Sequence, residues 1–320
     1  MNSSGLYKFL FDGLPVRGAL VRVTHGWCEA LRRRAVLGAF AAPVRVLLGE
    51  MTAAGLLMQA SIKFDGALIL QIHGDGPVKL AVAEVKSDLS FRTTAKVVAE
   101  VAEDARLAAL TNVTGAGRCA ITLDPRHRPP GTQPYQGVVS LHGLQREPLA
   151  NFSEVIEHYM LQSEQLDTKM MLAANDEVAA GLLLQRMPTG GRGNLATGRS
   201  EDLIGVHEDF NRLALLAATL TPEELLGLEV DTVLRRLFWQ EKLQRFDPLP
   251  TRFSCTCGRE RVQQMLLGLG RVELEEILAE RNLVEIGCEF CGQQYQFDAI
   301  DVGGMFTPMI AQPPSSSTLQ

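Results

Sequence analysis

Four of the six cysteines in this 320-residue chain lie in its last quarter, in two close pairs. One residue separates Cys255 from Cys257, two separate Cys288 from Cys291, and thirty residues lie between the pairs. Structural zinc sites hold the ion in a tetrahedron of four ligands, commonly cysteine thiolates. The pattern therefore predicts one Zn²⁺ per chain, bound by these four cysteines.

The two pairs differ in how easily they bring both sulfurs to one ion. In the second pair, the two-residue gap lets the sulfurs turn toward one point, and Gly292 permits the tight turn behind them. The sequence QQYQF that follows alternates like the second strand of a hairpin. The first pair would stand too far apart in an extended strand, so we expect the chain to bend at Thr256. Two short helices are expected between the pairs, separated by Gly268 and Gly270.

Other chemistry for the cysteines is less well supported. Permanent disulfides are disfavoured in a reducing compartment. A catalytic zinc keeps an open coordination position, which four sulfurs would close. Residues 255–302 contain four Arg, no Lys and nine Asp plus Glu, hence a charge of 4 − 9 = −5, which repels phosphate. A zinc-ribbon interaction module and a thiol-based oxidoreductase remain the alternatives.

A zinc site of this kind is also compatible with a redox switch. Zinc keeps its cysteine ligands as thiolates, the form that reacts with peroxide and hypochlorous acid. Either close pair could then form a disulfide within itself, in a very small and strained loop, and strained disulfides are the labile ones. Because metal binding contributes about 10–16 kcal/mol to the folding of a small zinc domain, oxidation is expected to unfold this module.

The elements that precede the cysteines indicate an α+β core in the first ~185 residues. Residues 44–62 are rich in Ala, Leu and Met and predict a buried helix. Residues 63–85 predict two or three strands joined by tight turns. Further strands are expected in residues 117–124, 136–143 and 176–187, and an amphipathic helix in residues 151–166.

A helical segment follows a Gly-, Ser- and Thr-rich connector at residues 188–200. Thr221 and Glu224 predict a capping box with Pro222 at the first helical position, and Asp231 is expected to cap the next helix. Helices this short are marginal unless their apolar faces are buried, so we expect them to pack on the core. Their apolar stripes comprise Phe210, Leu213, Ala214, Ala217, Val233, Leu234, Leu237 and Phe238.

Composition and charge restrict the class of protein. Hydrophobic residues make up 46% of the chain and charged residues 21%, which is typical of a globular protein. The net charge of −6 argues against general binding to nucleic acid or to an anionic membrane. No apolar run approaches the ~18–20 residues that span a bilayer, and no secretory signal is recognisable. We therefore expect a cytoplasmic protein.

Other candidate sites are weaker. The GDGP sequence at Gly74 resembles a phosphate-binding loop only in its glycines and is interpreted as a hairpin turn. The six histidines are scattered, without ligand-like spacing. Cys28 and Cys119 are predicted to be small buried side chains with no sensing role. No combination of residues forms a nucleophile–base–acid set, so no catalytic residue is assigned.

Taken together in order, several long motifs resemble the 33 kDa chaperonin family of redox-regulated holdase chaperones. They are YKFLFDGLPVRGALVRV, KFDGALILQIHGDGPVKLAV, HYMLQSEQLDT, TPEELL, DTVLRRLFWQE and FSCTCGRERV with CEFCG, and they span nearly the whole chain. Asp167 departs from the family, which commonly has proline there, and this is expected to loosen a local turn. The Ser163-Glu164-Gln165 segment is expected to have a packing role.

The resemblance implies a four-part chain. It consists of an α+β core for client binding and dimerisation (1–188), a connector with a metastable helical linker (189–246), a zinc-binding redox switch (247–303) and a disordered tail (304–320). The reduced, zinc-bound protein would be inactive and would hydrolyse no ATP. Oxidants would pair Cys255 with Cys257 and Cys288 with Cys291, releasing zinc and unfolding the switch and linker.

The activated protein would bind unfolding client proteins, commonly as a homodimer. The linker stripes are the expected client-binding surface, together with the core surface that they cover. The residues assigned to it are Phe210, Leu213, Leu234, Leu237 and Phe238.

Overall fold

A computed structural model describes residues 4–128, 131, 133–187 and 208–306 of the chain. Its internal contacts divide it into two compact units, Met1–Ser254 and Cys255–Gln320. The expected connector at residues 188–200 and residues 307–320 of the expected tail lie outside the described residues. Helix α10 (Ala299–Met305) includes the first two residues assigned to that tail.

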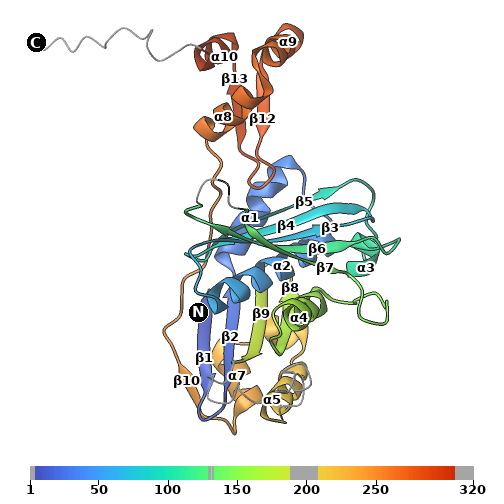
Figure 1. The fold of residues 1–320 in the computed structure, drawn as a ribbon, viewed down its shortest axis with the longest axis vertical. Helices are drawn as coiled ribbons and strands as arrows, with labels where there is room; N and C mark the ends of the chain where they lie inside the picture. The colour runs from blue at the N-terminus through green and yellow to red at the C-terminus, as the bar shows by residue number, and fades with distance from the viewer. Residues whose placement is uncertain (1–3, 129–130, 132, 188–207, 307–320) are drawn as a thin grey trace, which may run out of the picture. The chain divides into compact units, whose positions relative to one another are not determined.

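The described residues of the first unit form two β-sheets and the helices that cover them (Figure 1). The five-stranded sheet has the order β10-β1-β2-β9-β8 and the six-stranded sheet the order β11-β5-β4-β3-β6-β7. The strands are β1 (Gly5–Phe11), β2 (Val16–Val23), β3 (Gly66–His73), β4 (Val78–Lys86), β5 (Ser90–Val97), β6 (Arg118–Pro125), β7 (Tyr135–Ser140), β8 (Thr168–Ala174), β9 (Ala179–Arg186), β10 (Leu243–Arg245) and β11 (Arg252–Phe253). The helices outside the linker are α1 (His25–Arg34), the 3₁₀ turn η1 (Ala35–Leu37), α2 (Ala42–Ser61), α3 (Leu107–Thr111) and α4 (Phe152–Ser163).

Helix α2 lies between the two sheets and confirms the buried helix predicted there (Figure 1). Its side chains are apolar on nearly every face, because sheets cover it from both sides. Two glycines let it approach the strands closely: a methyl group on Gly49 would overlap the Ala174 side chain, and one on Gly55 would lie 2.9 Å from Val85. This packing forms the larger hydrophobic core, and the α+β class predicted from the sequence is confirmed.

The GDGP sequence is a hairpin turn between β3 and β4, as predicted. One carboxylate oxygen of Asp75 accepts hydrogen bonds from the Thr114 N–H (3.0 Å), the Thr114 hydroxyl (2.6 Å) and the Ala116 N–H (2.8 Å). The aspartate therefore ties the hairpin to the loop after α3, which is a structural role.

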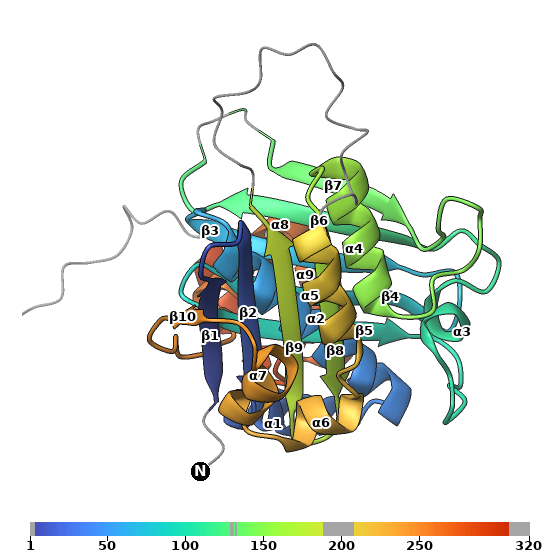
Figure 2. The ribbon, with the colours of Figure 1, turned by 90° about the horizontal axis from the view of Figure 1, so that it is seen from below.

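The described part of the segment predicted to be the linker contains α5 (Glu208–Ala218), α6 (Pro222–Gly227) and α7 (Val230–Phe238), called the linker helices below. They cover the five-stranded sheet on the face opposite α2 (Figure 2). The capping box of Thr221 and Glu224 is confirmed. The prediction that Asp231 caps α7 is wrong: Glu229 is the N-cap residue, and Asp231 forms an ion pair with Arg245 instead. The predicted apolar stripes are buried in a second hydrophobic core with strand residues such as Phe9 and Phe11.

Truncation of one linker leucine should show how much this second core stabilises the docked helices. Leu213 is 0% exposed and Leu215, two residues along α5, is 71% exposed. We expect Leu213→Ala to lower the free energy of unfolding by about 2–5 kcal/mol, because it leaves a cavity against the sheet. Urea unfolding of the reduced protein measures this. A Leu213→Ala effect no larger than that of Leu215→Ala would contradict the packing of α5.

The second unit is small, and its described residues form one hairpin and three helices. The elements are α8 (Arg259–Leu269), α9 (Arg271–Arg281), β12 (Val284–Gly287), β13 (Gln294–Phe297) and α10. The predicted hairpin strand and both helices are present, but Gly268 lies inside α8, so Gly270 alone separates the helices. Its core consists of a few apolar side chains, among them Leu266, Leu274 and Phe297. None of the helices described in either unit has the length and hydrophobicity required to span a membrane.

Candidate metal centre

The four cysteines of the two pairs converge at one point of the second unit. Their Sγ atoms all lie within 4.8 Å of one another. Cys255 Sγ lies 3.6 Å from Cys288 Sγ, and Cys257 Sγ lies 3.3 Å from Cys291 Sγ. Sulfurs at the corners of a tetrahedron with a metal–sulfur distance of about 2.3 Å would be about 3.8 Å apart. The spacing of the sulfurs is thus close to that of a four-thiolate zinc site.

The second pair is held by a tight backbone turn between β12 and β13. The N–H groups of Cys291 and Gly292 donate to the Cys288 carbonyl at 3.3 and 2.8 Å, and the Cys288 N–H donates to the Gln293 carbonyl at 2.9 Å. Gly292 has φ of +70°, a left-handed conformation that favours glycine. The turn needed to present both sulfurs is therefore built into the main chain.

The first pair lies in the irregular segment between β11 and α8. An Arg261 guanidinium nitrogen, from the first turn of α8, donates to the Thr256 carbonyl at 3.1 Å and to its hydroxyl at 2.8 Å. This contact anchors the backbone between Cys255 and Cys257, the position at which the sequence requires a bend.

The sulfurs influence one another electrostatically. The pKa of Cys255 is lowered to about 4, chiefly because the Cys288 thiol donates to its thiolate, and the same hydrogen bond raises the pKa of Cys288. Burial raises the pKa of Cys291 to about 11. Tyr295, on β13, hydrogen bonds to Cys257, which raises the pKa of the tyrosine. Four thiolates this close together require a neighbouring cation to remain ionised together.

The chemistry of the donors fits zinc. The cluster consists only of sulfur, the soft ligand that Zn²⁺ binds in closed structural sites. Among the residues that the structure describes, it is the one group of His, Cys, Asp or Glu side chains arranged to hold a metal ion. A unit with so small an apolar core would depend on such a cross-link for its stability.

The five proposed client-binding residues belong to the first unit, whereas the four clustered cysteines belong to the second. All five are buried between the linker helices and the five-stranded sheet: Phe210, Leu213, Leu234, Leu237 and Phe238. Phe238 packs against Phe11 with ring centroids 5.0 Å apart and against Phe9 at 6.3 Å. In this conformation the stripes are therefore covered.

Sequence reasoning missed Arg22, a buried arginine on β2 that holds the linker. It is 2% exposed, and burial lowers its pKa. Its guanidinium donates to the carbonyls of Leu225 (3.1 Å), Leu228 (3.3 Å) and Leu226, where α6 ends. A helix leaves its last carbonyls unpaired, and a cation there also complements the helix dipole. The one sequence signal was a charged residue inside the apolar strand VRGALVRV.

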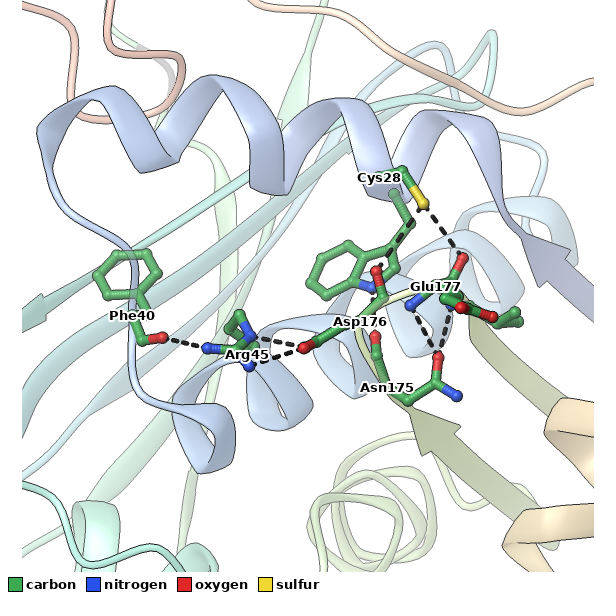
Figure 3. A network of polar contacts seen from close by, with 8 residues as sticks. Cys28, Phe40, Arg45, Asn175, Asp176 and Glu177 are labelled. Atoms are coloured by element: carbon green, nitrogen blue, oxygen red, sulfur yellow. Dashed lines mark hydrogen bonds and ion pairs between the residues drawn. The ribbon is translucent and has the colours of Figure 1, made fainter.

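The prediction that Cys28 is buried is wrong, whereas that for Cys119 is confirmed. Figure 3 shows the Cys28 side chain beside the turn between β8 and β9, where its thiol donates to the Glu177 carbonyl at 3.4 Å. Asp176 of the same turn forms an ion pair with Arg45 of α2. Cys28 remains exposed at this position on α1. Cys119 lies on β6, between β3 and β7, and burial raises its pKa to about 12.

Asp167, the departure from the family pattern, does not loosen its turn. It is 5% exposed and pairs with Arg186 at 2.8 Å, and its carbonyl accepts the Arg186 N–H at 3.0 Å. The two hydrogen bonds fix the start of β8 against the end of β9. In the neighbouring segment, Glu164 accepts from the hydroxyls of Tyr159 (2.6 Å) and Tyr135 (3.1 Å), which agrees with the expected packing role.

Glu50 of α2 should make the stability of the first unit depend on pH. It lines a cavity of about 280 Å³ with Glu103, Asp104 and Arg106, and burial raises its pKa to about 7. The unfolded chain releases this proton near pH 4.5 and the folded chain near pH 7, so stability falls as pH rises between these values. We expect Glu50→Gln to stabilise the protein at pH 8, by at most about 3 kcal/mol, and to have little effect at pH 4.5. Urea midpoints at both pH values test this; equal effects at both would contradict it.

Comparisons with known proteins agree with this architecture. The sequence model of the family described as "Hsp33 protein" matches residues 4–298. The 33 kDa chaperonin of Chromobacterium violaceum is 43% identical over 301 residues, covering 94% of this chain and 93% of that protein. The 33 kDa chaperonin of Nitrosococcus oceani is 36% identical over 318 residues, covering 99% of each.

The fold is also found in a solved structure. The crystal structure of a 33 kDa chaperonin, heat shock protein 33 homolog, from Thermotoga maritima superposes with a TM-score of 0.72, covering 95% of this chain and 98% of that chain at 21% identity. The match over nearly the full length, the identity to the relatives and the four-cysteine cluster lead to one conclusion. This chain belongs to the Hsp33 family of redox-regulated chaperones, which are not enzymes.

Proposed function

We propose that this chain is an ATP-independent holdase in which Cys255, Cys257, Cys288 and Cys291 bind Zn²⁺ in the inactive, reduced state. The observation that carries the proposal is the convergence of the four sulfurs in a unit whose own core is small. A bound Zn²⁺ would cross-link the thiolates and contribute about 10–16 kcal/mol to the folding of such a unit.

Oxidation would withdraw the ligands. In each pair, one thiolate attacks peroxide to give a sulfenic acid and hydroxide, and the second thiolate displaces hydroxide from that sulfur. Each disulfide thus forms at the expense of one peroxide, which is reduced to two hydroxides. We infer the pairs Cys255–Cys257 and Cys288–Cys291. Sulfurs of different pairs also approach each other in the closed cluster, but only sequence neighbours stay close once the unit opens.

Loss of the closed unit would then free the linker, whose helices are short and depend on burial for their stability. The apolar side chains of α5 and α7 and the sheet surface beneath them would bind unfolding client proteins. The core (1–188), linker (189–246) and switch (247–303) thus have separate roles. We further propose that the active form is a homodimer and that it acts in the cytoplasm, where the thiols stay reduced until oxidative stress.

The proposal is tested by following metal and activity together. The reduced protein is assayed for bound zinc and then treated with peroxide at mildly elevated temperature. Light scattering of thermally unfolding malate dehydrogenase reports client protection, and peptide mapping identifies the disulfides. We expect zinc release and protection to rise together. Protection that is already maximal in the reduced, zinc-loaded protein would contradict the switch.

A further inference from the structure

The segment of residues 242–254, called the strap below, closes one edge of each sheet in the first unit. Its β10 pairs antiparallel with β1, the edge strand of the five-stranded sheet, and Leu249 continues the pairing opposite Leu6 (Figure 1). Its β11 pairs parallel with β5, at the edge of the six-stranded sheet. The strap follows α7 in the chain and ends immediately before Cys255.

On β1 the strap is held through its main chain. The Leu6 N–H donates to the Leu249 carbonyl at 2.9 Å, and the Leu249 N–H donates back to the Leu6 carbonyl at 2.8 Å. The Phe246 N–H donates to the Lys8 carbonyl at 3.1 Å, and the Lys242 carbonyl accepts from Asp12 at 2.9 Å. All residues of the strap are described, and the side chain of none of them is buried. Backbone pairing of this kind depends little on the sequence of the added strand.

The β11 end has more support from side chains. Phe253 packs edge-on against Phe91, with ring centroids 6.2 Å apart, and Arg33 lies over its ring at 5.5 Å. Arg252 also forms an ion pair with Asp88. The β1 edge is thus the one at which an unrelated peptide could most readily replace the strap.

Two prolines leave the outer side of the strap around Leu249 without hydrogen-bond donors. Both backbone polar groups of Leu249 face β1, so the nitrogens of Pro248 and Pro250 face away from the sheet. Proline has no N–H, so this stretch of the strap offers no donors to another chain. An uncovered strand edge, in contrast, is a template for pairing with another polypeptide.

We propose that, once the strap leaves, the β1 edge binds an extended segment of the unfolding client as an added antiparallel strand. This inference rests on the proposed function. Any unfolded polypeptide carries the N–H and C=O groups that the edge requires, which explains how clients of unrelated sequence are recognised. Phe9 and Phe11 of the same strand belong to the core that the linker covers, so the added strand would lie beside the uncovered apolar surface.

A peptide copy of the strap, residues 242–254, isolates the backbone contribution. We expect the fluorescently labelled peptide to bind the oxidised full-length protein and to compete with malate dehydrogenase for it. N-methylation at Phe246 and Leu249, whose N–H groups face β1, should weaken binding at least tenfold. The matched control is N-methylation at Leu243 and Arg245, whose N–H groups face outward in the β10–β1 register and should tolerate the methyl groups. Equal affinity of the two methylated peptides would overturn the proposal.

Hydrogen exchange on the protein itself gives a second test. The amides of Leu6 and Asp12 should exchange slowly in the reduced protein, quickly after oxidation, and slowly again when unfolded malate dehydrogenase is bound. Fast exchange of these two amides in the client complex would contradict strand addition. Slow exchange that returns with the concentration of this protein, and not with that of the client, would contradict it as well. If the client is protected from aggregation in either case, the chaperone function stands. An oxidised protein that suppresses no aggregation defeats both proposals.

Discussion

Replacement of Cys288 by serine is expected to remove most of the bound zinc from the reduced protein and to unfold the unit Cys255–Gln320. The substitution deletes one of four thiolates that meet within 4.8 Å, in a unit with a small core. Because the metal is expected to contribute about 10–16 kcal/mol to folding, losing even part of that exceeds the stability of a unit this small. Zinc content and protease resistance of the reduced protein measure the effect.

Cys28→Ser is the matched control, since Cys28 is an exposed thiol outside the cluster. It should leave zinc content and protease resistance unchanged. Cys288→Ser should also give client protection without oxidant, because it disconnects the switch. A Cys288→Ser protein that keeps its full zinc content and resists protease as the parent does would contradict the assignment of the metal ligands.

Arg22→Met is expected to open the linker without touching the cysteines. The substitution leaves the carbonyls of Leu225, Leu226 and Leu228 without their donor at a buried helix end. Leaving buried polar groups unpaired costs about 1–3 kcal/mol each, so we estimate a loss of about 3 kcal/mol in linker docking. That corresponds to roughly a hundredfold increase in the open population. The reduced, zinc-loaded variant should therefore protect malate dehydrogenase from aggregation.

Arg32→Met serves as the control, because Arg32 is 70% exposed and pairs only locally with Glu29. The reduced Arg32→Met protein should protect malate dehydrogenase no better than the parent protein does. If Arg22→Met has the same activity as Arg32→Met and retains its zinc, the arginine does not hold the linker closed.

The four-cysteine cluster could be located from the sequence because its signal is local. Ligand type and spacing identified all four cysteines, and Gly292 marked the turn behind one pair. The two helices between the pairs and the strand after the second pair also followed from short-range patterns. The exact helix boundaries were predicted less well. Gly268 was expected to separate the two helices but lies within α8, because the packing of neighbouring residues can offset the low helix propensity of one glycine.

Several features could not be predicted from the sequence, because they depend on contacts between residues that are distant in the chain. Arg22 meets carbonyls some 200 positions later in the chain. Cys28 was expected to be buried from its residue type, but its position on α1 leaves it exposed. Asp167 was expected to loosen a turn, yet Arg186 on the next strand neutralises and fixes it. The pairing of the strap with the sheet edges could not be predicted either, since backbone pairing leaves little signal in the sequence.

Hydrogen exchange of helices α5, α6 and α7, measured in one sample before and after oxidation, tests most directly whether zinc binding controls the linker. We predict slow exchange in these helices while zinc is bound and exchange at least a hundredfold faster after peroxide has released it, with α2 still protected. Linker amides that remain as protected after zinc release as before would show that the metal centre and the linker are not coupled.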